Sequence, residues 1–223
     1  MITAITLLRR KPGLTTREFQ SYWKTRHAAV IETLPGIDRY TQSHPLHDQP
    51  EDAEPAWDGI AELWAKDSQS FRDIGASDAY RLVLKDEENF LDRDATALVL
   101  TDALLRREGQ AAADGVKYVR FLKRRPGFAP EDFQAYWRDT YGPLVDALPG
   151  LGRYVQYHAR LGGYKGGREP AFDGVDATWF ADVAGLRTAF VSAAAGRMRS
   201  AEAAFLAPGN PPGIATREFL LIG

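Results

Sequence analysis

Apolar residues recur along this chain first in a short β-prone run and then at helical spacing. The run Ile2–Leu8 ends shortly before a Pro12-Gly13 turn, which predicts a strand. A capping box at Thr15 and Glu18 then precedes apolar residues spaced for one face of a helix, and Pro35-Gly36 ends that run. We therefore expect a helix over about 15–34.

The pattern continues with two strands, a helical stretch and a final strand. The two strands are expected over 37–46 and 57–64, the second entered through an Asp58-Gly59 turn. A helical stretch over 68–91 is interrupted near Gly75, and a strand follows over about 95–105. The order strand–helix–strand–strand–helix–strand is ferredoxin-like and predicts a four-stranded antiparallel sheet with two helices on one face.

The same order of predicted strands and helices occurs twice along the chain. Pro12, Trp23 and Pro35 have counterparts 114 positions later, and after one inserted residue the Asp-Gly turn returns 115 positions later. The second copy starts its helix with Pro130 and repeats the strands over 151–161, 172–179 and 214–222, with one helical stretch over 181–206. The repeat predicts two α+β domains over 1–108 and 116–223, joined by a flexible linker at 109–115. Because each sheet alone would leave one face bare, we expect the sheets to pack together as an intrachain pseudo-dimeric α/β barrel.

Composition narrows the choice of partner. The chain has 223 residues, 44% of them hydrophobic, a formal net charge of −2 and no cysteine. The near-neutral charge argues against nucleic acid or an anionic membrane as a partner, and the lack of cysteine is compatible with a cytoplasmic location. The first residues lack the order of a signal peptide, and no apolar run is long enough for a transmembrane helix. We expect a small-molecule ligand, in a monomeric pseudo-dimer or a homodimer.

A set of motifs in fixed order resembles the EthD domain family. The motifs are Phe-x-x-Tyr-Trp, a helix histidine, Leu-Pro-Gly, Arg-Tyr and Gln-x-His, followed by Asp-Gly and a tryptophan-containing strand. The first copy matches at Phe19, Tyr22, Trp23, His27, Leu34, Pro35, Gly36, Arg39, Tyr40, Gln42 and His44. The second copy matches at Phe133, Tyr136, Trp137, Leu148, Pro149, Gly150, Arg153, Tyr154, Gln156 and His158. It departs at Tyr141, where the family pattern has the helix histidine.

The resemblance extends over almost the whole chain and implies a dimeric α/β-barrel fold. It also implies either a small cofactor-free enzyme of aromatic polyketide chemistry or an accessory of an ether-degrading oxygenase system. Dehydration, decarboxylation and cyclisation are the reactions implied for the enzyme. We expect no cofactor.

His27 is the leading candidate for catalysis. Helical spacing places Phe19, Trp23 and His27 on one stripe facing the sheet, and an imidazole can transfer protons near neutral pH. The alternative is a core histidine bonded to a strand carbonyl. Tyr141 stands at the matching position. An unperturbed phenol stays protonated near neutral pH, so it cannot serve as a base there, although it can donate a hydrogen bond to a substrate. One working site in the first copy is therefore expected.

The triplet Tyr40, Gln42 and His44 falls on one face of its strand, and Tyr154, Gln156 and His158 repeat it. Facing a cavity, the triplet would bind substrate, with His44 as a second catalytic group and His158 as a contact. Facing the opposite sheet, it would be a structural network. Trp23 is more simply a core residue than a substrate platform.

Other motifs are interpreted as structural. His44 and His47 fall on opposite strand faces, so no metal site is expected. Asp58 and Asp173 are interpreted as turn formers, and the glycine-rich segment 162–167 as a loop that can close over a pocket, because no helix start follows it.

Three functions follow from these observations. The first is a cofactor-independent lyase, cyclase or dehydratase that acts on an aromatic or polyketide-like molecule by histidine acid–base catalysis. The second is an oxidoreductase, either a cofactor-free monooxygenase or an oxygenase accessory. The third is a non-catalytic small-molecule binding protein.

Overall fold

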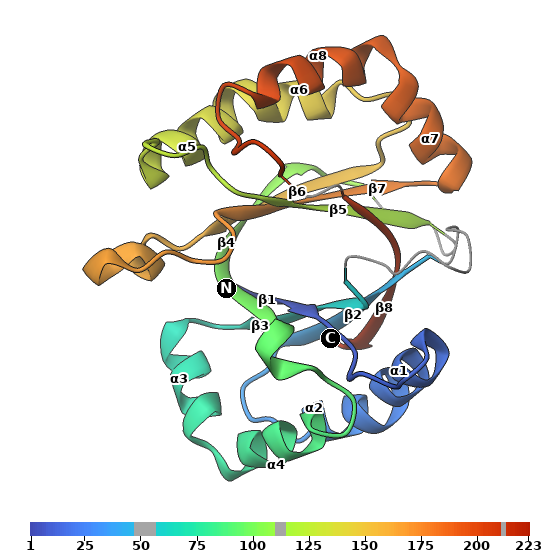
Figure 1. Cartoon of the computed structure of the whole chain (residues 1–223), viewed down its shortest axis with the longest axis vertical. Coiled ribbons are helices and arrows are strands. Elements are labelled where there is room, and N and C mark those ends of the chain that lie inside the picture. Colours follow the sequence, from blue (N-terminus) through green and yellow to red (C-terminus); the bar gives the residue numbers. More distant parts are fainter. Residues whose placement is uncertain (47–56, 110–114, 211–212) are drawn as a thin grey trace. The chain divides into compact units, whose positions relative to one another are not determined.

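The computed structural model describes residues 1–46, 57–109, 115–210 and 213–223 and divides the chain into two compact units. Unit 1 comprises Met1–Leu100 and Glu218–Gly223, and unit 2 comprises Thr101–Arg217. Each unit combines antiparallel strands with helices gathered on one side of them, so the expected α+β class is confirmed (Figure 1). Most of the linker expected at 109–115 lies outside the described residues.

Strand β3 (Gly59–Ala65) is the centre of the unit 1 sheet. It pairs antiparallel with β1 (Ile2–Leu8) on one side and with β2 (Arg39–Pro45) on the other. Ala61 lies opposite both Thr6 and Gln42, which fixes the register at the middle of the sheet. Strand β4 (Ala97–Arg107) begins in this unit, after a short 3-10 turn η2 (Arg93–Ala95).

The first helix of unit 1 carries the expected capping box. Helix α1 (Thr16–Tyr22) has Thr15 as its N-cap, and the Glu18 carboxylate accepts from the Thr15 backbone in return. A π-helical turn η1 (Trp23–His27) follows directly and leads into α2 (Ala28–Ile31). Five residues in such a turn keep Trp23 and His27 on one face, and turns of this kind are frequent at functional sites.

Unit 2 repeats these elements and keeps its own sheet order. The strands β5 (Val116–Leu122), β6 (Arg153–Ala159), β7 (Gly174–Phe180) and β8 (Ile214–Ile222) pair antiparallel in the order β6–β7–β5–β8. Residues Thr101–Arg107 of β4 pair with β6 at the other edge, so the last strand of the first repeat lies in the sheet of unit 2. This pairing explains why the compact units and the sequence repeats have different boundaries.

The helices of unit 2 match those of unit 1. Helix α5 (Pro130–Tyr136), the π-helical turn η3 (Trp137–Tyr141) and α6 (Gly142–Asp146) form the first helical segment. The glycine-rich segment expected to be a loop forms 3-10 turns, η4 (Leu161–Gly167), that are interrupted at Lys165 and Gly166.

Each unit breaks its second helical segment at a serine. Unit 1 has α3 (Ser68–Ala76) and α4 (Asp78–Glu87), and unit 2 has α7 (Val183–Val191) and α8 (Ala193–Glu202). The single helical stretch expected over 181–206 was therefore wrong. Ser192 adopts an extended backbone and its hydroxyl accepts from the Ala195 backbone, which ends one helix and begins the next, as Ser77 does in unit 1.

Close packing of tryptophan on glycine positions the first helix in both units. A Cβ atom at Gly59 would lie 2.5 Å from the Trp23 ring, and Gly174 meets the Trp137 ring in the same way. Phe19 and Trp23 are fully buried in the unit 1 core. Glycine at the Asp-Gly turn is therefore required by the close approach of a ring, which a side chain would block.

Strands and helical segments follow one another along each copy as the sequence predicts, with the second helical segment in two pieces, whereas the face-to-face packing of two ferredoxin-like sheets as a barrel stays a prediction. Within the described ranges, no helix is long and apolar enough to cross a membrane.

Candidate functional site

A cavity of about 430 Å³ lies in unit 1 between the sheet and the helices. Its walls are mainly aliphatic and aromatic side chains from β1, β2, β3, β4, α3 and α4, with Trp23 and His27 from the π-helical turn. The volume and apolar lining are typical of a site for a small organic molecule. The cavity is therefore the candidate small-molecule site of this unit.

His27 is held in the cavity wall by Asp86. Its Nδ1 lies 2.8 Å from Asp86 Oδ2, and its ring packs on Phe90 with 4.8 Å between centroids. A carboxylate at this position accepts the Nδ1 proton, which leaves Nε2 as the nitrogen with a lone pair. The histidine side chain is only 6% exposed. His27 is therefore oriented by a carboxylate of helix α4, and not by a strand carbonyl as the alternative interpretation supposed.

Tyr22 and Asn89 hold the other side of this carboxylate. The Tyr22 hydroxyl donates to Asp86 Oδ1 at 2.7 Å, and Asn89 Nδ2 donates to the Tyr22 hydroxyl at 3.1 Å. Both Asp86 oxygens are thus engaged, which restricts rotation of the carboxylate. A fixed carboxylate in turn fixes the orientation and tautomer of His27.

Burial shifts the pKa values of two residues in the cavity wall, His27 and Glu87. It lowers the pKa of His27, and the Asp86 charge and hydrogen bond only partly oppose it, so the imidazole is neutral near pH 7. Burial also raises the pKa of Glu87, which lines the same cavity, while Arg93 at 3.5 Å opposes that rise. The cavity thus has a neutral base and a carboxyl with increased proton affinity.

The Tyr40, Gln42 and His44 triplet forms a buried hydrogen-bond chain. Gln42 Nε2 donates to the Trp23 carbonyl and to the Tyr40 hydroxyl, both at 2.8 Å, and Gln42 Oε1 lies 2.9 Å from His44 Nε2. The Trp23 indole N–H also donates to the Tyr40 hydroxyl at 3.1 Å, and His44 stacks on the Trp23 ring. Within the described residues, Trp23 and Tyr40 line the cavity, whereas Gln42 and His44 lie behind them.

Unit 2 repeats the chain with one added acid. Gln156 Nε2 donates to the Tyr154 hydroxyl at 2.8 Å, and Gln156 Oε1 lies 3.1 Å from His158 Nε2. The Tyr154 hydroxyl and the Trp137 indole both donate to Asp176 Oδ1, at 2.7 and 3.0 Å. Burial, with the nearby Arg138 and Arg106, lowers the pKa of His158 to about 4, so the ring is neutral. The triplet's repetition in both units indicates that it braces the helix against the sheet.

Buried charges stand in unit 2 at positions where small side chains line the cavity of unit 1. Arg120 corresponds to Thr6, and Asp176 corresponds to Ala61. The Arg120 guanidinium bonds the Tyr141 hydroxyl at 2.5 Å and Glu202 Oε1 at 2.8 Å, and Tyr141 donates to Glu202 at 3.0 Å. The guanidinium thus bonds the counterparts of His27 and Glu87, which are Tyr141 and Glu202.

Tyr141 is therefore engaged within the protein. Its side chain is fully buried, and burial holds the pKa of the phenol well above its usual range, with Arg120 opposing the rise. The hydroxyl is a neutral group between an arginine and a glutamate. The exchange of His27 for Tyr141 thus accompanies an arginine–glutamate ion pair at the corresponding place in unit 2.

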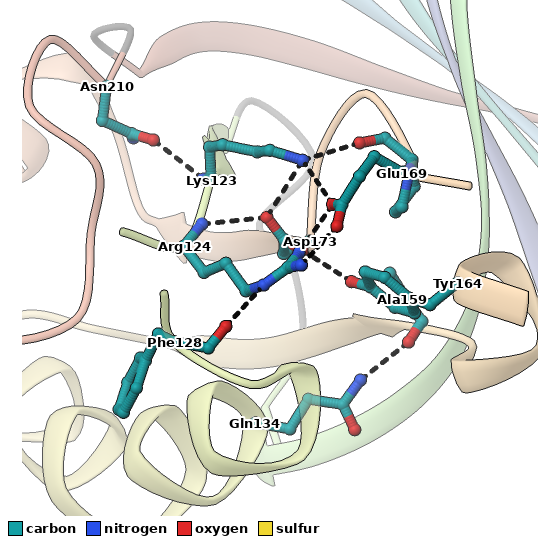
Figure 2. A network of polar contacts seen from close by, with 10 residues as sticks. Lys123, Arg124, Phe128, Gln134, Ala159, Tyr164, Glu169, Asp173 and Asn210 are labelled. Carbon is teal, nitrogen blue, oxygen red and sulfur yellow. Dashed lines mark hydrogen bonds and ion pairs between the residues drawn. The ribbon is translucent and has the colours of Figure 1, made fainter. Parts of the chain in front are cut away.

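Asp58 and Asp173 form structural ion pairs. Both carboxylates are fully buried and accept from the backbone N–H of Arg10 and Arg124, respectively, at 2.9 Å, and each also pairs with that arginine's guanidinium. Figure 2 shows how unit 2 extends this pair: the Tyr164 hydroxyl donates to Asp173 at 2.7 Å, and Glu169 pairs with the arginine at 2.6 Å. The turn of η4 is thereby fastened to the end of β5.

No group of three or more His, Cys, Asp or Glu side chains within the described ranges is arranged to hold a metal ion. His47, the partner considered for His44 in the sequence, lies outside the described residues.

The sequence pattern did not predict a role for Asp86 and Glu87. They stand in a polar run at the end of α4 that looks like a solvated helix end. Comparison of the two copies at an offset of 115 would have marked the position, because Asp86 is matched by Ala201 while Glu87 is matched by Glu202. The same comparison separates Thr6 and Ala61 from Arg120 and Asp176.

The fold and the site define a class: an α+β protein with duplicated elements, in which one unit holds an apolar small-molecule cavity with a histidine–carboxylate pair. The family model of the EthD domain matches the chain twice, at residues 11–94 and 125–208. The chain belongs to the EthD family, as the sequence motifs indicated. Among curated proteins, none matches this chain.

Solved structures share the fold at low sequence identity. An anthrone oxidase-like protein has a TM-score of 0.65 at 13% identity, covering 99% of this chain and 93% of its own. A proposed monooxygenase from Lactobacillus acidophilus has a TM-score of 0.57 at 10% identity, covering 98% and 94%. A proposed chlorite dismutase has a TM-score of 0.55 at 11% identity, also covering 98% and 94%. These proteins are similar to this chain in fold.

Proposed function

We propose that the unit 1 cavity is the active site of a cofactor-independent lyase, cyclase or dehydratase for an aromatic or polyketide-like molecule. The observation that carries the proposal is the His27–Asp86 pair in the wall of an apolar cavity. His27 Nε2 takes a proton from the bound substrate, and Asp86 stabilises the imidazolium that forms. General acid–base transfer of this kind contributes about 10²–10⁴-fold to rate.

The remaining wall residues position the substrate. Trp23 offers an apolar face and Tyr40 a hydroxyl, and the pKa of that hydroxyl is raised by burial, so it stays protonated. Gln42 and His44 act behind them by holding the phenol and the indole in place. Their role is positioning, because they lie outside the cavity lining.

The test follows turnover of aryl polyketones and phenols by product mass and dissolved oxygen. Loss of water or carbon dioxide, or ring closure without oxygen uptake, is expected from the wild type. His27→Ala should abolish the reaction while the variant keeps its far-UV spectrum and still binds the ligand. Lys165→Ala, in the η4 turn of unit 2, is the control and should react as the wild type does. Full activity of His27→Ala would refute the assignment.

An oxidoreductase is the second candidate, favoured by the shared fold with proteins named as an anthrone oxidase-like protein and a monooxygenase. A phenol deprotonated by His27 is the form that reacts with oxygen, so the same base serves both candidates. Stoichiometric oxygen uptake with a phenol would select this function. A ligand that binds and is recovered unchanged, with His27→Ala altering affinity alone, would select a binding protein instead.

A further inference from the structure

Glu87 brings a second titratable group to the cavity that holds His27. It is the last residue of α4, and its neighbour Asp86 is the residue that binds His27. Adjacent helix residues project about 100° apart, so one carboxylate reaches the imidazole while the other lines the cavity. The two positions place an acid and a base in the wall of one apolar site.

We propose that Glu87 is a catalytic acid that works with His27 on an enolisable carbonyl compound. This inference rests on the proposed function of the cavity and names the second proton-transfer group and the chemical class of the substrate. The carboxyl donates to the carbonyl oxygen while the imidazole removes a proton from the adjacent carbon. The carbonyl oxygen and the α-carbon are separated by the carbonyl carbon, so transfer of both protons in one step uses two groups.

The proton balance of the step is closed. The α-carbon–hydrogen bond breaks, its proton goes to His27 Nε2, and its electron pair forms the carbon–carbon double bond. The carbonyl π electrons take the proton from Glu87, which leaves an enol, an imidazolium and a carboxylate. Enol formation followed by reprotonation returns both protons, so no oxidant or reductant is consumed. An enol formed this way is the nucleophile in a cyclisation, and it is the intermediate from which a protonated β-hydroxyl leaves as water in a dehydration.

The charges around Glu87 favour this assignment. Burial has the largest effect on the carboxyl and raises its pKa, the Asp86 charge raises it further, and Arg93 at 3.5 Å opposes both. The Arg93 side chain is 47% exposed, so the opposing charge is shared with solvent. Tyr80 also lines the cavity, and burial together with the Glu87 charge raises the pKa of its phenol, so it remains neutral. Burial thus acts in the direction of the protonated form that the proposed step uses.

Glu202, the counterpart of Glu87 in unit 2, forms an ion pair instead. Glu202 pairs with the buried Arg120 at 2.8 Å, and the pKa of that guanidinium is raised by Tyr141 and Glu202, so it is a permanent cation. Thr6 stands where Arg120 would be, and Glu87 therefore meets the cavity in place of a buried guanidinium. The same residue type thus lines a cavity in unit 1 and pairs with a guanidinium in unit 2.

The test measures deuterium exchange at C1 of 2-tetralone, a ketone whose C1 protons are both benzylic and α to the carbonyl, with the exchange in buffer alone as the reference rate. The purified full chain is mixed with the ketone in D₂O, and loss of the C1 proton signal is followed by NMR. Glu87→Gln keeps size and hydrogen bonding but has no proton to give, and it should slow the enzymatic exchange by about 10²-fold. Glu202→Gln is the matched control in unit 2 and should exchange at the wild-type rate. Thermal unfolding and 2-tetralone affinity are measured for each variant.

The outcomes separate the role of Glu87 from the proposed function of the cavity. Exchange slowed in both Glu87→Gln and His27→Ala, with affinity retained, supports the pair. Wild-type exchange in Glu87→Gln together with loss in His27→Ala overturns the role of Glu87 and leaves the proposed function standing. Wild-type exchange in both variants overturns both. Exchange no faster than in buffer with the wild type overturns the enolisable substrate class, while the polyketone assay still decides the function of the cavity.

Discussion

Removing the carboxylate charge beside His27 should disable the site without unfolding it. In the wild type, Asp86 Oδ2 lies 2.8 Å from His27 Nδ1, and the Tyr22 hydroxyl donates to the other oxygen. In Asp86→Asn the side-chain amide can donate to Nδ1, which moves the imidazole proton to Nε2. The nitrogen that serves as base is then blocked, so turnover should collapse while ligand binding persists.

The size of the effect follows from burial of the pair. The His27 and Asp86 side chains are 6% and 14% exposed. A hydrogen bond to a charged partner is worth about 1.5–3 kcal/mol, and about 1.4 kcal/mol corresponds to one pH unit. Because Asp86 favours the imidazolium, its replacement should lower the pKa of His27 by a further one to two pH units or so, in the same direction as burial.

The assay is an NMR titration of the histidine ring protons, with the His27 signal assigned by its loss in His27→Ala. Asp78→Asn removes an exposed carboxylate from the same helix and should leave the His27 titration unchanged. The wild-type and Asp86→Asn curves are compared over the same pH range at equal ionic strength. An unchanged or raised pKa of His27 in Asp86→Asn would refute the reasoning, since it would mean that the carboxylate does not stabilise the imidazolium.

Three further predictions concern the differences between the units. Thr6→Arg should place a guanidinium beside Glu87, as Arg120 stands beside Glu202, and calorimetry should find no binding of 2-tetralone to a folded protein; retained binding would contradict the view that an arginine fills this space. Arg120→Ala should lower the free energy of unfolding by about 1–3 kcal/mol in urea titrations, because its side chain is 13% exposed, bonds Glu202 and lies near the buried Asp176, whereas Arg93→Ala, at a 47% exposed side chain, should cost under about 1 kcal/mol; equal costs would contradict this. Burial raises the pKa of Asp176 from 3.8 to about 6, so its stabilising contribution is complete below pH 3.8 and is lost as pH rises through about 6. Urea titrations should therefore show the stability of the wild type relative to Asp176→Asn falling by up to about 3 kcal/mol over that window, and a flat difference would argue against a buried acid.

The fold of each repeat could be predicted from sequence because its signals are local. The Thr15–Glu18 capping box and the Asp-Gly turns fixed where elements begin, and the β1 and β8 bounds agree with those expected. The break at Ser192 was missed because an apolar alanine-rich stretch continues across it, and only the extended backbone and the serine cap reveal two helices.

The site could be predicted only in part. His27 stood out through its spacing and through its exchange for Tyr141, both of which are visible in one chain. Asp86 was hidden because its role depends on a contact 59 residues away in sequence. The filling of the unit 2 site depends on Arg120 and Asp176, which are charged residues inside strands and become informative only when they are aligned with Thr6 and Ala61.

The buried charges of unit 2 also constrain the history of the duplication. An aspartate acquired at 176 before any arginine would have been a buried acid with no nearby cation, a strongly destabilising intermediate. An arginine acquired at 120 first would have met a carboxylate already in place, since glutamate stands at 202 and at its counterpart 87. The arginine-first path avoids that unstable ancestor. The second copy therefore gained its buried-site arginine before its extra acid.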